Sequence, residues 1–190
     1  MKRTILHLLP IALAGCAVWL VLSLINPARA QSPQAKLDVN GTTRTKVVQI
    51  TGGADLAEPF DVSGDQIKPG YVVSIDPDRP GALRVSDRAY DKTVAGCLSG
   101  ANGVNPGLIM QHEGTSANGQ YPVALSGRVY CYADADFGAI APGDLLTTSD
   151  TPGHLQVVRD PDRARGAIVG KAMSALKDGR GLILVLVTLQ

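Results

Sequence analysis

An internal duplication is the feature that most constrains how this chain can fold. The stretch Ile140–Val158 repeats the landmarks of Ile67–Val85 in the same order. Both copies begin Ile-x-Pro-Gly, continue with a short apolar run and a second Pro-Gly, and reach a Leu-x-Val. Beyond the repeat, Val94-Ala-Gly96 falls where Ile168-Val-Gly170 falls in the second copy. Because a repeat of this length is one supersecondary unit, we expect the fold to contain that unit twice.

Each Pro-Gly pair predicts a tight turn between extended segments. Proline presets φ at the second position of a type II β-turn, and glycine supplies the positive φ of the third. Alternation of apolar and polar residues in Leu83–Val85 and Leu155–Val157 predicts strands with one buried face. The predicted turn residues are Pro69, Gly70, Pro80, Gly81, Pro142, Gly143, Pro152 and Gly153.

Composition favours many short strands over long helices. The 21 glycines and 12 prolines are spaced as turns along the 190 residues, and aromatic residues make up only 4%. The core must therefore be built from Val, Ile, Leu and Ala. We expect an all-β domain over residues 46–190, a small barrel or sandwich with an internal pseudo-duplication, preceded by a flexible segment over residues 31–45.

Four stretches outside the repeat carry definite expectations. Lys46–Ile50 and Pro122–Ala133 are predicted strands, whereas residues 52–64 are predicted to be irregular. Gly181–Gln190 is a near-continuous apolar run. That pattern is typical of a strand buried on both faces, so we expect it to run through the centre of the barrel.

Residues 1–30 have the pattern of a secretory signal peptide. Lys2 and Arg3 precede an apolar stretch over residues 5–25, and the leader ends in small residues at Ala30. We therefore expect cleavage after Ala30 and export to the periplasm, the cell surface or the medium. Two alternatives stay open: residues 5–25 could be retained as a membrane anchor, and Leu13-Ala-Gly-Cys16 resembles a lipobox with Cys16 as the lipidated residue.

The charge balance argues against partners that are recognised mainly through negative charge. The formal net charge is +1, and the leader holds the three basic residues Lys2, Arg3 and Arg29 without an acid, which leaves the remainder near −2. Nucleic acid is therefore not an expected partner, and a membrane is one only if the leader is retained.

Cys97 and Cys131 are the cysteines that remain after cleavage. Both lie on predicted strands that could be neighbours. They are therefore either a disulfide, as an oxidising compartment favours, or two buried thiols that act as small apolar side chains. Sequence alone leaves these two alternatives open, because geometry decides between them.

Neither metal nor cofactor chemistry is expected. His112 and His154 have no ligands at zinc spacing, and His154 follows a turn, so we expect it to face solvent. The acidic pairs Asp134/Asp136 and Asp160/Asp162 offer too few oxygens for Ca²⁺ and are expected to be solvated turns. Asp144 and Asp150 are expected to accept hydrogen bonds from backbone N–H groups at the turns of the second copy.

No catalytic signature is present in the sequence. Ser126, His154 and Asp144 could be assembled on paper into a hydrolytic triad, but Ser126 lies inside a predicted strand and has no Gly-x-Ser-x-Gly elbow around it. We therefore expect a non-enzymatic module. A secreted hydrolase or self-processing enzyme stays open as the alternative.

Four motifs resemble a known family. Leu37–Thr45 (LDVNGTTRT) resembles the phrase that precedes the distal domains of bacterial and phage tail-fibre-like proteins. Pro122–Val129, Gly138–Ser149 and Gly166–Met173 resemble a small β module near the C-termini of such proteins, and the pattern is also similar to capsid-decoration-type β domains. The resemblance covers residues 33–190. It implies a free-standing exported module with a structural, assembly or surface-binding role.

Two polar loops are the expected recognition elements, since exposed loops on a rigid β scaffold commonly carry binding. They are Gly100–Pro106 and Gln111–Gln120. Expected partners are further copies of the chain, with a trimer among the assemblies considered, or an envelope protein, surface protein or glycan. Self-association is expected through a sheet edge or an apolar face.

Overall fold

The computed structural model describes residues 39–189 of the chain. Internal contacts divide the chain into two units, Met1–Val47 and Val48–Gln190, and only the second is described at length. The predictions for the leader, including cleavage after Ala30 and the role of Cys16, lie outside the described residues, as does most of the expected flexible segment. Over residues 39–189 no helix has the length and apolar character needed to cross a membrane.

The second unit is almost entirely β structure, as the sequence predicted. Its eleven strands over residues 48–189 form one continuous sheet system. The strands are β1 (Asp55–Phe60), β2 (Val62–Ser63), β3 (Val72–Ile75), β4 (Leu83–Val85), β5 (Val94–Leu98), β6 (Leu108–Ile109), β7 (Tyr121–Asp134), β8 (Leu145–Thr148), β9 (Leu155–Val157), β10 (Ile168–Ala172) and β11 (Arg180–Val187). The helical parts are two 3-10 turns, η1 (Ala101–Gly103) and η2 (Ala135–Phe137), and the short helix α2 (Pro161–Ala164).

The C-terminal half closes into a five-stranded barrel. Its strands pair in the order β7, β9, β8, β10, β11, and β11 returns to pair with β7. β7 and β9 are parallel, and every other pair in the ring is antiparallel. Closure leaves this half without a free sheet edge.

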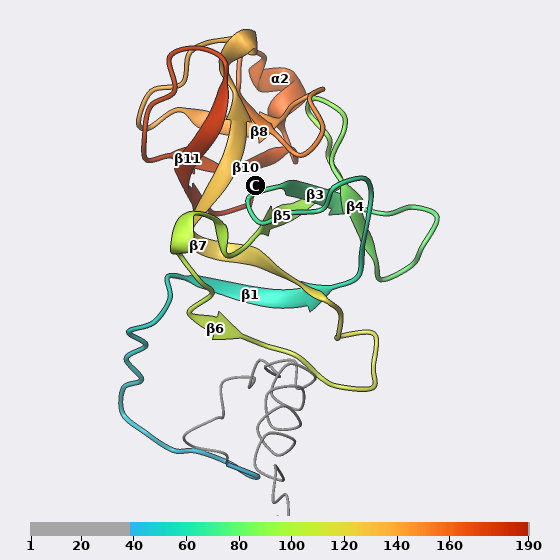
Figure 1. Ribbon diagram of the computed structural model, residues 1–190, viewed down its shortest axis with the longest axis vertical. Coiled ribbons are helices and arrows are strands. Elements are labelled where there is room, and N and C mark those ends of the chain that lie inside the picture. The colour runs from blue at the N-terminus through green and yellow to red at the C-terminus, as the bar shows by residue number, and fades with distance from the viewer. Residues whose placement is uncertain (1–38, 190) are drawn as a thin grey trace, which may run out of the picture. The chain divides into compact units, whose positions relative to one another are not determined.

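The N-terminal half forms a ring with the same connectivity. β1 and β2 are separated by Asp61 alone and act together as one bent strand. β2 pairs in parallel with β4, followed by antiparallel β3, β5 and β7, and β7 returns to β1. The 14-residue β7 is therefore the last strand of the first ring and the first strand of the second. Figure 1 shows it passing from beside β1 to beside β11.

The strand registers of the two halves match residue for residue, which confirms the pseudo-duplication. Both central hairpins pair three equivalent positions, and both have a register shift where the hairpin meets the following strand. The matched pairs are Val73–Val85 with Leu146–Val157, Ser74–Arg84 with Thr147–Gln156, and Ile75–Leu83 with Thr148–Leu155.

The four Pro-Gly pairs have the geometry of the predicted turns. Each glycine has a positive φ, between 71° and 97°. Each turn also has the hydrogen bond that closes a β-turn, as in Tyr71 N–H to the carbonyl of Lys68 and His154 N–H to the carbonyl of Thr151. One pair precedes each of β3, β4, β8 and β9.

β11 corrects one expectation from the sequence. Ile183, Val185 and Val187 are buried, whereas the alternate residues Leu182 and Leu186 are each 37% exposed. The prediction of a strand buried on both faces was therefore wrong. A strand in a barrel wall has one face inside and one outside, and no second layer covers the outside of β11 completely.

The start of the domain corrects two further predictions. Lys46–Ile50 is not a strand, and residues 52–64, predicted to be irregular, contain β1 and β2. β1 was missed because Asp55, Ala57 and Pro59 face inward, so the segment lacks apolar alternation. It is held by pairing with β7, which lies more than sixty residues later and cannot be inferred from local pattern.

A loop forms a second link between the two halves. In residues 86–92, Ala89 N–H donates to Asp150 Oδ1 at 2.9 Å, and Asp91 N–H donates to Thr148 Oγ1 at 2.8 Å. Asp150 was expected to cap its own turn, but its carboxylate instead holds this loop. The fully buried Asp91 accepts from Arg84 and Arg88.

The shared register gives a direct test. A Cβ at Gly170 would overlap the carbonyl oxygen of Leu186, and the equivalent Gly96 has the same relation to Ala124. Gly170→Ala should therefore lower the free energy of unfolding by about 2–4 kcal/mol, as measured by urea denaturation.

Gly52→Ala is the matched control, because a Cβ there meets nothing within 4 Å. It should change stability by less than about 0.5 kcal/mol. Equal stability of the Gly170→Ala and Gly52→Ala proteins would contradict the register described above.

Candidate functional site

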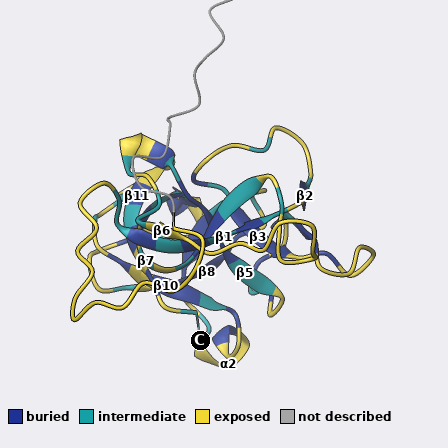
Figure 2. Cartoon of the chain, turned by 90° about the horizontal axis from the view of Figure 1, so that it is seen from below, coloured by how far each residue is buried: buried dark blue, intermediate teal, exposed yellow. Residues whose placement is uncertain are grey.

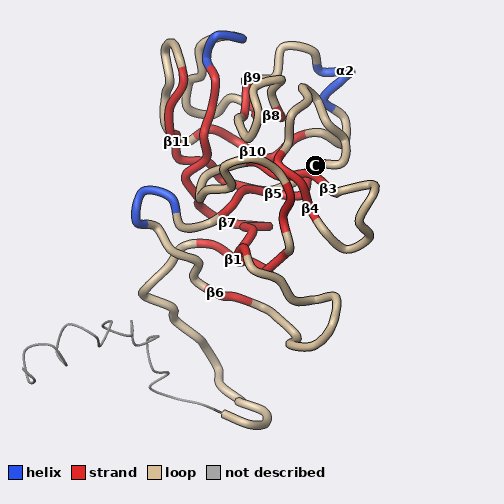
Figure 3. Tube along the Cα trace, turned by 45° about the vertical axis from the view of Figure 1, so that its right-hand side comes forward, coloured by secondary structure: helices blue, strands red, loops and turns tan. Residues whose placement is uncertain are grey.

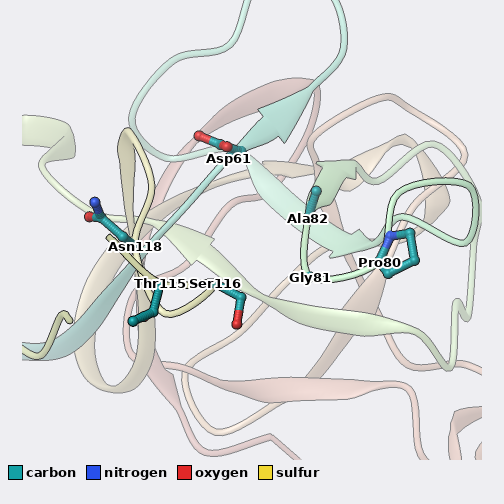
Figure 4. A pocket seen from close by; sticks show the side chains of 7 residues that line it. All are labelled: Asp61, Pro80, Gly81, Ala82, Thr115, Ser116 and Asn118. Carbon is teal, nitrogen blue, oxygen red and sulfur yellow. The ribbon is translucent and has the colours of Figure 1, made fainter. Parts of the chain in front are cut away.

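A polar hollow lies between the predicted recognition loop 111–120 and the tip of the first Pro-Gly hairpin. Its volume is about 150 Å³. Figure 4 shows the loop residues on one side and the turn on the other, with Asp61 beside them. The lining residues are Asp61, Pro80, Gly81, Ala82, Thr115, Ser116 and Asn118.

Internal hydrogen bonds give the loop its shape. His112 N–H donates to the carbonyl of Ala117 at 2.8 Å, and the Thr115 hydroxyl donates to the carbonyl of His112 at 2.8 Å. Gly119 packs so closely on the Phe60–Asp61 backbone that a Cβ there would overlap it. The loop is therefore anchored to the end of β1. No hydrogen bond to a described residue uses the Ser116 hydroxyl or the Asn118 amide, so these groups are free to meet a ligand.

The opposite wall is held by Asp76. Its carboxylate accepts from Asp78 N–H at 3.1 Å and from the Ser63 hydroxyl at 3.0 Å, and Arg79 lies 3.8 Å away. The hydrogen bond from Asp78, then that from Ser63 and the charge of Arg79, outweigh burial and lower the pKa of Asp76. These contacts of Asp76 fix the turn at Pro80-Gly81. Both walls of the hollow are therefore preorganised.

A second hollow lies on the outer face of the β7–β11 pair. It has a volume of about 260 Å³ and is mainly apolar, with one guanidinium. Its lining residues are Ala54, Val104, Arg128, Tyr130 and Leu184. Val104 belongs to the other predicted loop, Gly100–Pro106, so each predicted recognition loop lines one hollow.

His154 is half-buried, so the prediction that it faces solvent holds only in part. Its ring lies 5.4 Å from the ring of Tyr132 and 5.9 Å from that of Tyr71, and Lys68 Nζ lies over both tyrosines. Nδ1 is 2.7 Å from the carbonyl oxygen of Pro152. Burial is the largest influence and lowers the pKa of His154. The imidazole packs against tyrosine rings at the junction of the two halves. The prediction made from the turn alone could not show this packing.

One member of the acidic pairs, Asp134, differs from expectation. Asp134 is buried and accepts from Arg180 Nε at 2.7 Å, from the Thr151 hydroxyl at 2.6 Å and from Asp136 N–H at 2.9 Å. Burial raises its pKa, but these hydrogen bonds outweigh it and the pKa is lowered. Of this pair Asp134 is therefore not solvated, contrary to the prediction, whereas Asp136 is exposed.

The remaining acids have local structural roles. Asp160 caps α2 by accepting from two N–H groups, one of them that of Asp162. Asp144 accepts from Ala141 N–H at 2.8 Å within its turn, as predicted. Among residues 39–189 no group of three His, Cys, Asp or Glu side chains is placed to hold a metal ion.

Cys97 and Cys131 are both free and fully buried. Of the two alternatives from the sequence, the structure has the pair of buried thiols. Burial, and next the neighbouring Cys131, raise the pKa of Cys97 well above its ordinary value. The Cys97 thiol donates to the carbonyl of Tyr130 at 3.7 Å.

The triad considered on paper is dispersed in the structure. Ser126 is exposed on β7, and His154 contacts Tyr132, six residues further along the same strand. At about 3.3 Å per residue these positions are roughly 20 Å apart along β7. The carboxylate of Asp144 is engaged in its own turn.

The sequence predicted the loop of the polar hollow as a recognition element, but it did not indicate the other residues of the site. Asp61 and the wall formed by Pro80-Gly81 reach the loop only through tertiary structure. The polar loop and the Pro-Gly turn could each be identified in the sequence. No local sequence pattern indicated that they would lie on opposite sides of one hollow. Comparisons with models of known protein families and with curated protein sequences find no match, so no relative assigns a role to these residues.

The packing of His154 predicts a pH dependence. We expect its pKa, followed by NMR titration, to lie below the ordinary 6.5. Because the folded chain binds this proton less readily than the unfolded chain, stability should fall as pH drops through 6.5 toward the folded pKa. Tyr71→Ala should move the pKa back up by exposing the ring.

His154→Gln is the control for the stability curve, because it removes the titrating group. The pH dependence of the wild-type protein between 7 and 5 should be steeper than that of this variant. A pKa of His154 at or above 6.5 in the folded protein would contradict the packing described.

Proposed function

We propose that the protein is an exported, non-enzymatic β module that binds a component of the cell surface through the polar hollow, similar in role to the distal modules of fibre-like proteins. The observation that carries the proposal is the pairing of unengaged polar groups with rigid walls. Ser116 and Asn118 line the hollow together with the fixed Pro80–Ala82 turn.

The lining indicates the chemistry of the ligand. The lining residues carry a carboxylate, two hydroxyls and an amide, and none of them is a cation or a large apolar side chain. Such groups exchange hydrogen bonds with hydroxyl- and amide-rich polymers. A polysaccharide of the cell envelope is the ligand class that fits this lining.

Preorganisation supports a binding role on this scaffold. The loop is tied to itself and to the end of β1, and the turn is tied to Asp76. Ligand binding therefore orders few additional side chains, and its entropic cost is small.

The sequence of the leader supports export. If the chain is cleaved after Ala30, Trp19 is removed and the mature protein contains no tryptophan. We expect the protein recovered from an exporting host to begin at Gln31 by intact mass, and to show tyrosine but no tryptophan emission. Recovery of the mature protein with Trp19 would contradict cleavage, and lipid attached to Cys16 would show the lipoprotein route.

Binding at the hollow is tested with isolated cell-envelope fragments of an exporting host. The double variant Ser116→Ala/Asn118→Ala removes two polar groups, each worth about 0.5–1.5 kcal/mol, and should weaken binding by about 5- to 150-fold in a sedimentation assay.

Ser126→Ala is the matched control, since it removes an exposed hydroxyl on β7 away from the hollow. It should bind as the wild-type protein does. The proposal fails if the wild-type protein does not sediment with the fragments, or if the double variant binds equally well. Release of soluble fragments during incubation would favour the hydrolase alternative.

A further inference from the structure

We propose that two copies of the chain assemble by reciprocal strand addition, in which Lys46–Ile50 of each copy pairs with the free edge of β6 in the other. This inference goes beyond the proposed function and does not depend on ligand binding at the polar hollow. It rests on two features of the chain, a sheet edge and a β-prone segment, each of which has no pairing partner among the described residues.

The first feature is an open sheet edge. β6 pairs with β1 on one side, through Leu56–Leu108 and Ala57–Ile109, and with no strand among the described residues on the other. Figure 3 shows β6 next to β1 with no strand beyond it. The remaining strands of both halves lie in the two rings, so this is where further pairing is available.

The edge is also apolar on both faces. Leu108, Ile109 and Met110 are 45–48% exposed, and Figure 2 shows β6 as exposed. Consecutive strand residues point to opposite faces, so exposure of all three means that neither face is covered. No charge or proline interrupts residues 107–110, although natural edges are commonly protected by such residues.

The second feature is a β-prone segment that pairs with no strand among the described residues. Five of the seven residues 45–51 are β-branched, and the sequence predicts a strand over Lys46–Ile50. In the structure this segment is non-helical and unpaired, with Val47 79% and Val48 70% exposed. Exposed β-branched residues of this kind are suited to a pleated, half-buried surface, which a sheet edge supplies.

The segment and the region around the β6 edge carry charges of opposite sign. Residues 39–54 contain Arg44 and Lys46 and no acid. The chain between Lys92 and Arg128, which includes β6, contains Glu113 and no lysine or arginine, and β1 beside it adds Glu58. The segment is therefore basic and the edge region acidic, which favours their association and orients it.

The connection to β1 favours a second copy over the same chain as the partner. Ala54 N–H donates to the carbonyl of Asn105 at 3.2 Å, and Gly53 packs directly against Pro106 and Gly107. The segment therefore joins the domain at the start of β6. The flank of β1, where a simple hairpin would place it, is already occupied by β6.

Reciprocal exchange satisfies both features in a closed two-fold assembly. Each copy supplies one segment and receives one, so both β6 edges are covered and the contact closes on itself instead of extending into a fibre. Gly107–Met110 spans roughly 13 Å at the usual strand rise, which the five residues of Lys46–Ile50 can cover.

Light scattering on the full chain, recovered as an exporting host leaves it, tests the proposal. The wild-type protein should have twice the mass of one chain at concentrations between about 10 and 100 µM of chain, a range that spans one decade. Ile109→Lys places a charge on the edge, and Val48→Lys places one on the segment. Each should raise the dimer dissociation constant at least tenfold.

Leu186→Lys is the matched control, because Leu186 is a comparably exposed apolar residue on the outer face of β11. It should remain dimeric. Thermal unfolding of the lysine variants should show that each is folded. A monomeric wild-type protein, or an Ile109→Lys protein that remains dimeric, would overturn the proposal.

Cross-linking identifies the contact independently of mass. Val48→Cys and Ile109→Cys proteins, mixed and oxidised, should form a mixed disulfide dimer, while the fully buried Cys97 and Cys131 stay unreacted. If the double variant instead cross-links only within one chain at low concentration, the segment pairs with its own β6 and the exchange is excluded.

Discussion

The fold depends on one strand that belongs to two rings at once. β7 pairs along its first half with β1 and β5, and along its second half with β11 and β9. Its inward side chains, among them Val123, Ala124, Val129 and Cys131, are fully buried in the two hydrophobic clusters. Because a strand cannot slip by one residue without turning its apolar face outward, β7 fixes the register of both halves together.

The loop over residues 86–92 adds a polar link to this shared strand. Its buried Asp91 is surrounded by donors from Arg84, Arg88 and Thr93, and its backbone bonds to Thr148 and Asp150 in the other half. Burial raises the pKa of Asp91, but the hydrogen bonds from Thr93 and Arg88 outweigh it and lower the pKa. A satisfied buried network of this kind favours one arrangement of the two halves over others.

The proposed binding site and the proposed assembly edge lie in different parts of the domain. The polar hollow is formed where loop 111–120 meets the first hairpin, and the free edge lies at β6, just before that loop. The second half, closed into a complete barrel, has no such edge. The two halves are thus similar, but the first has in β6 a strand with an edge that no described strand covers.

The sequence by itself determined the local structure and the repeat. Pro-Gly fixes backbone dihedrals within four residues, and alternation fixes which face of a short strand is buried, so the turns, the hairpins and the all-β class could be read from pattern. The tertiary structure decided what depends on distant partners. β1 exists because β7 pairs with it, the outer face of β11 is exposed because the barrel has no second layer, and His154 is packed because Tyr71 and Tyr132 converge on it. The polar hollow also depends on distant partners. Its walls are separated by more than thirty residues in the sequence and meet only when the strands between them close into a ring.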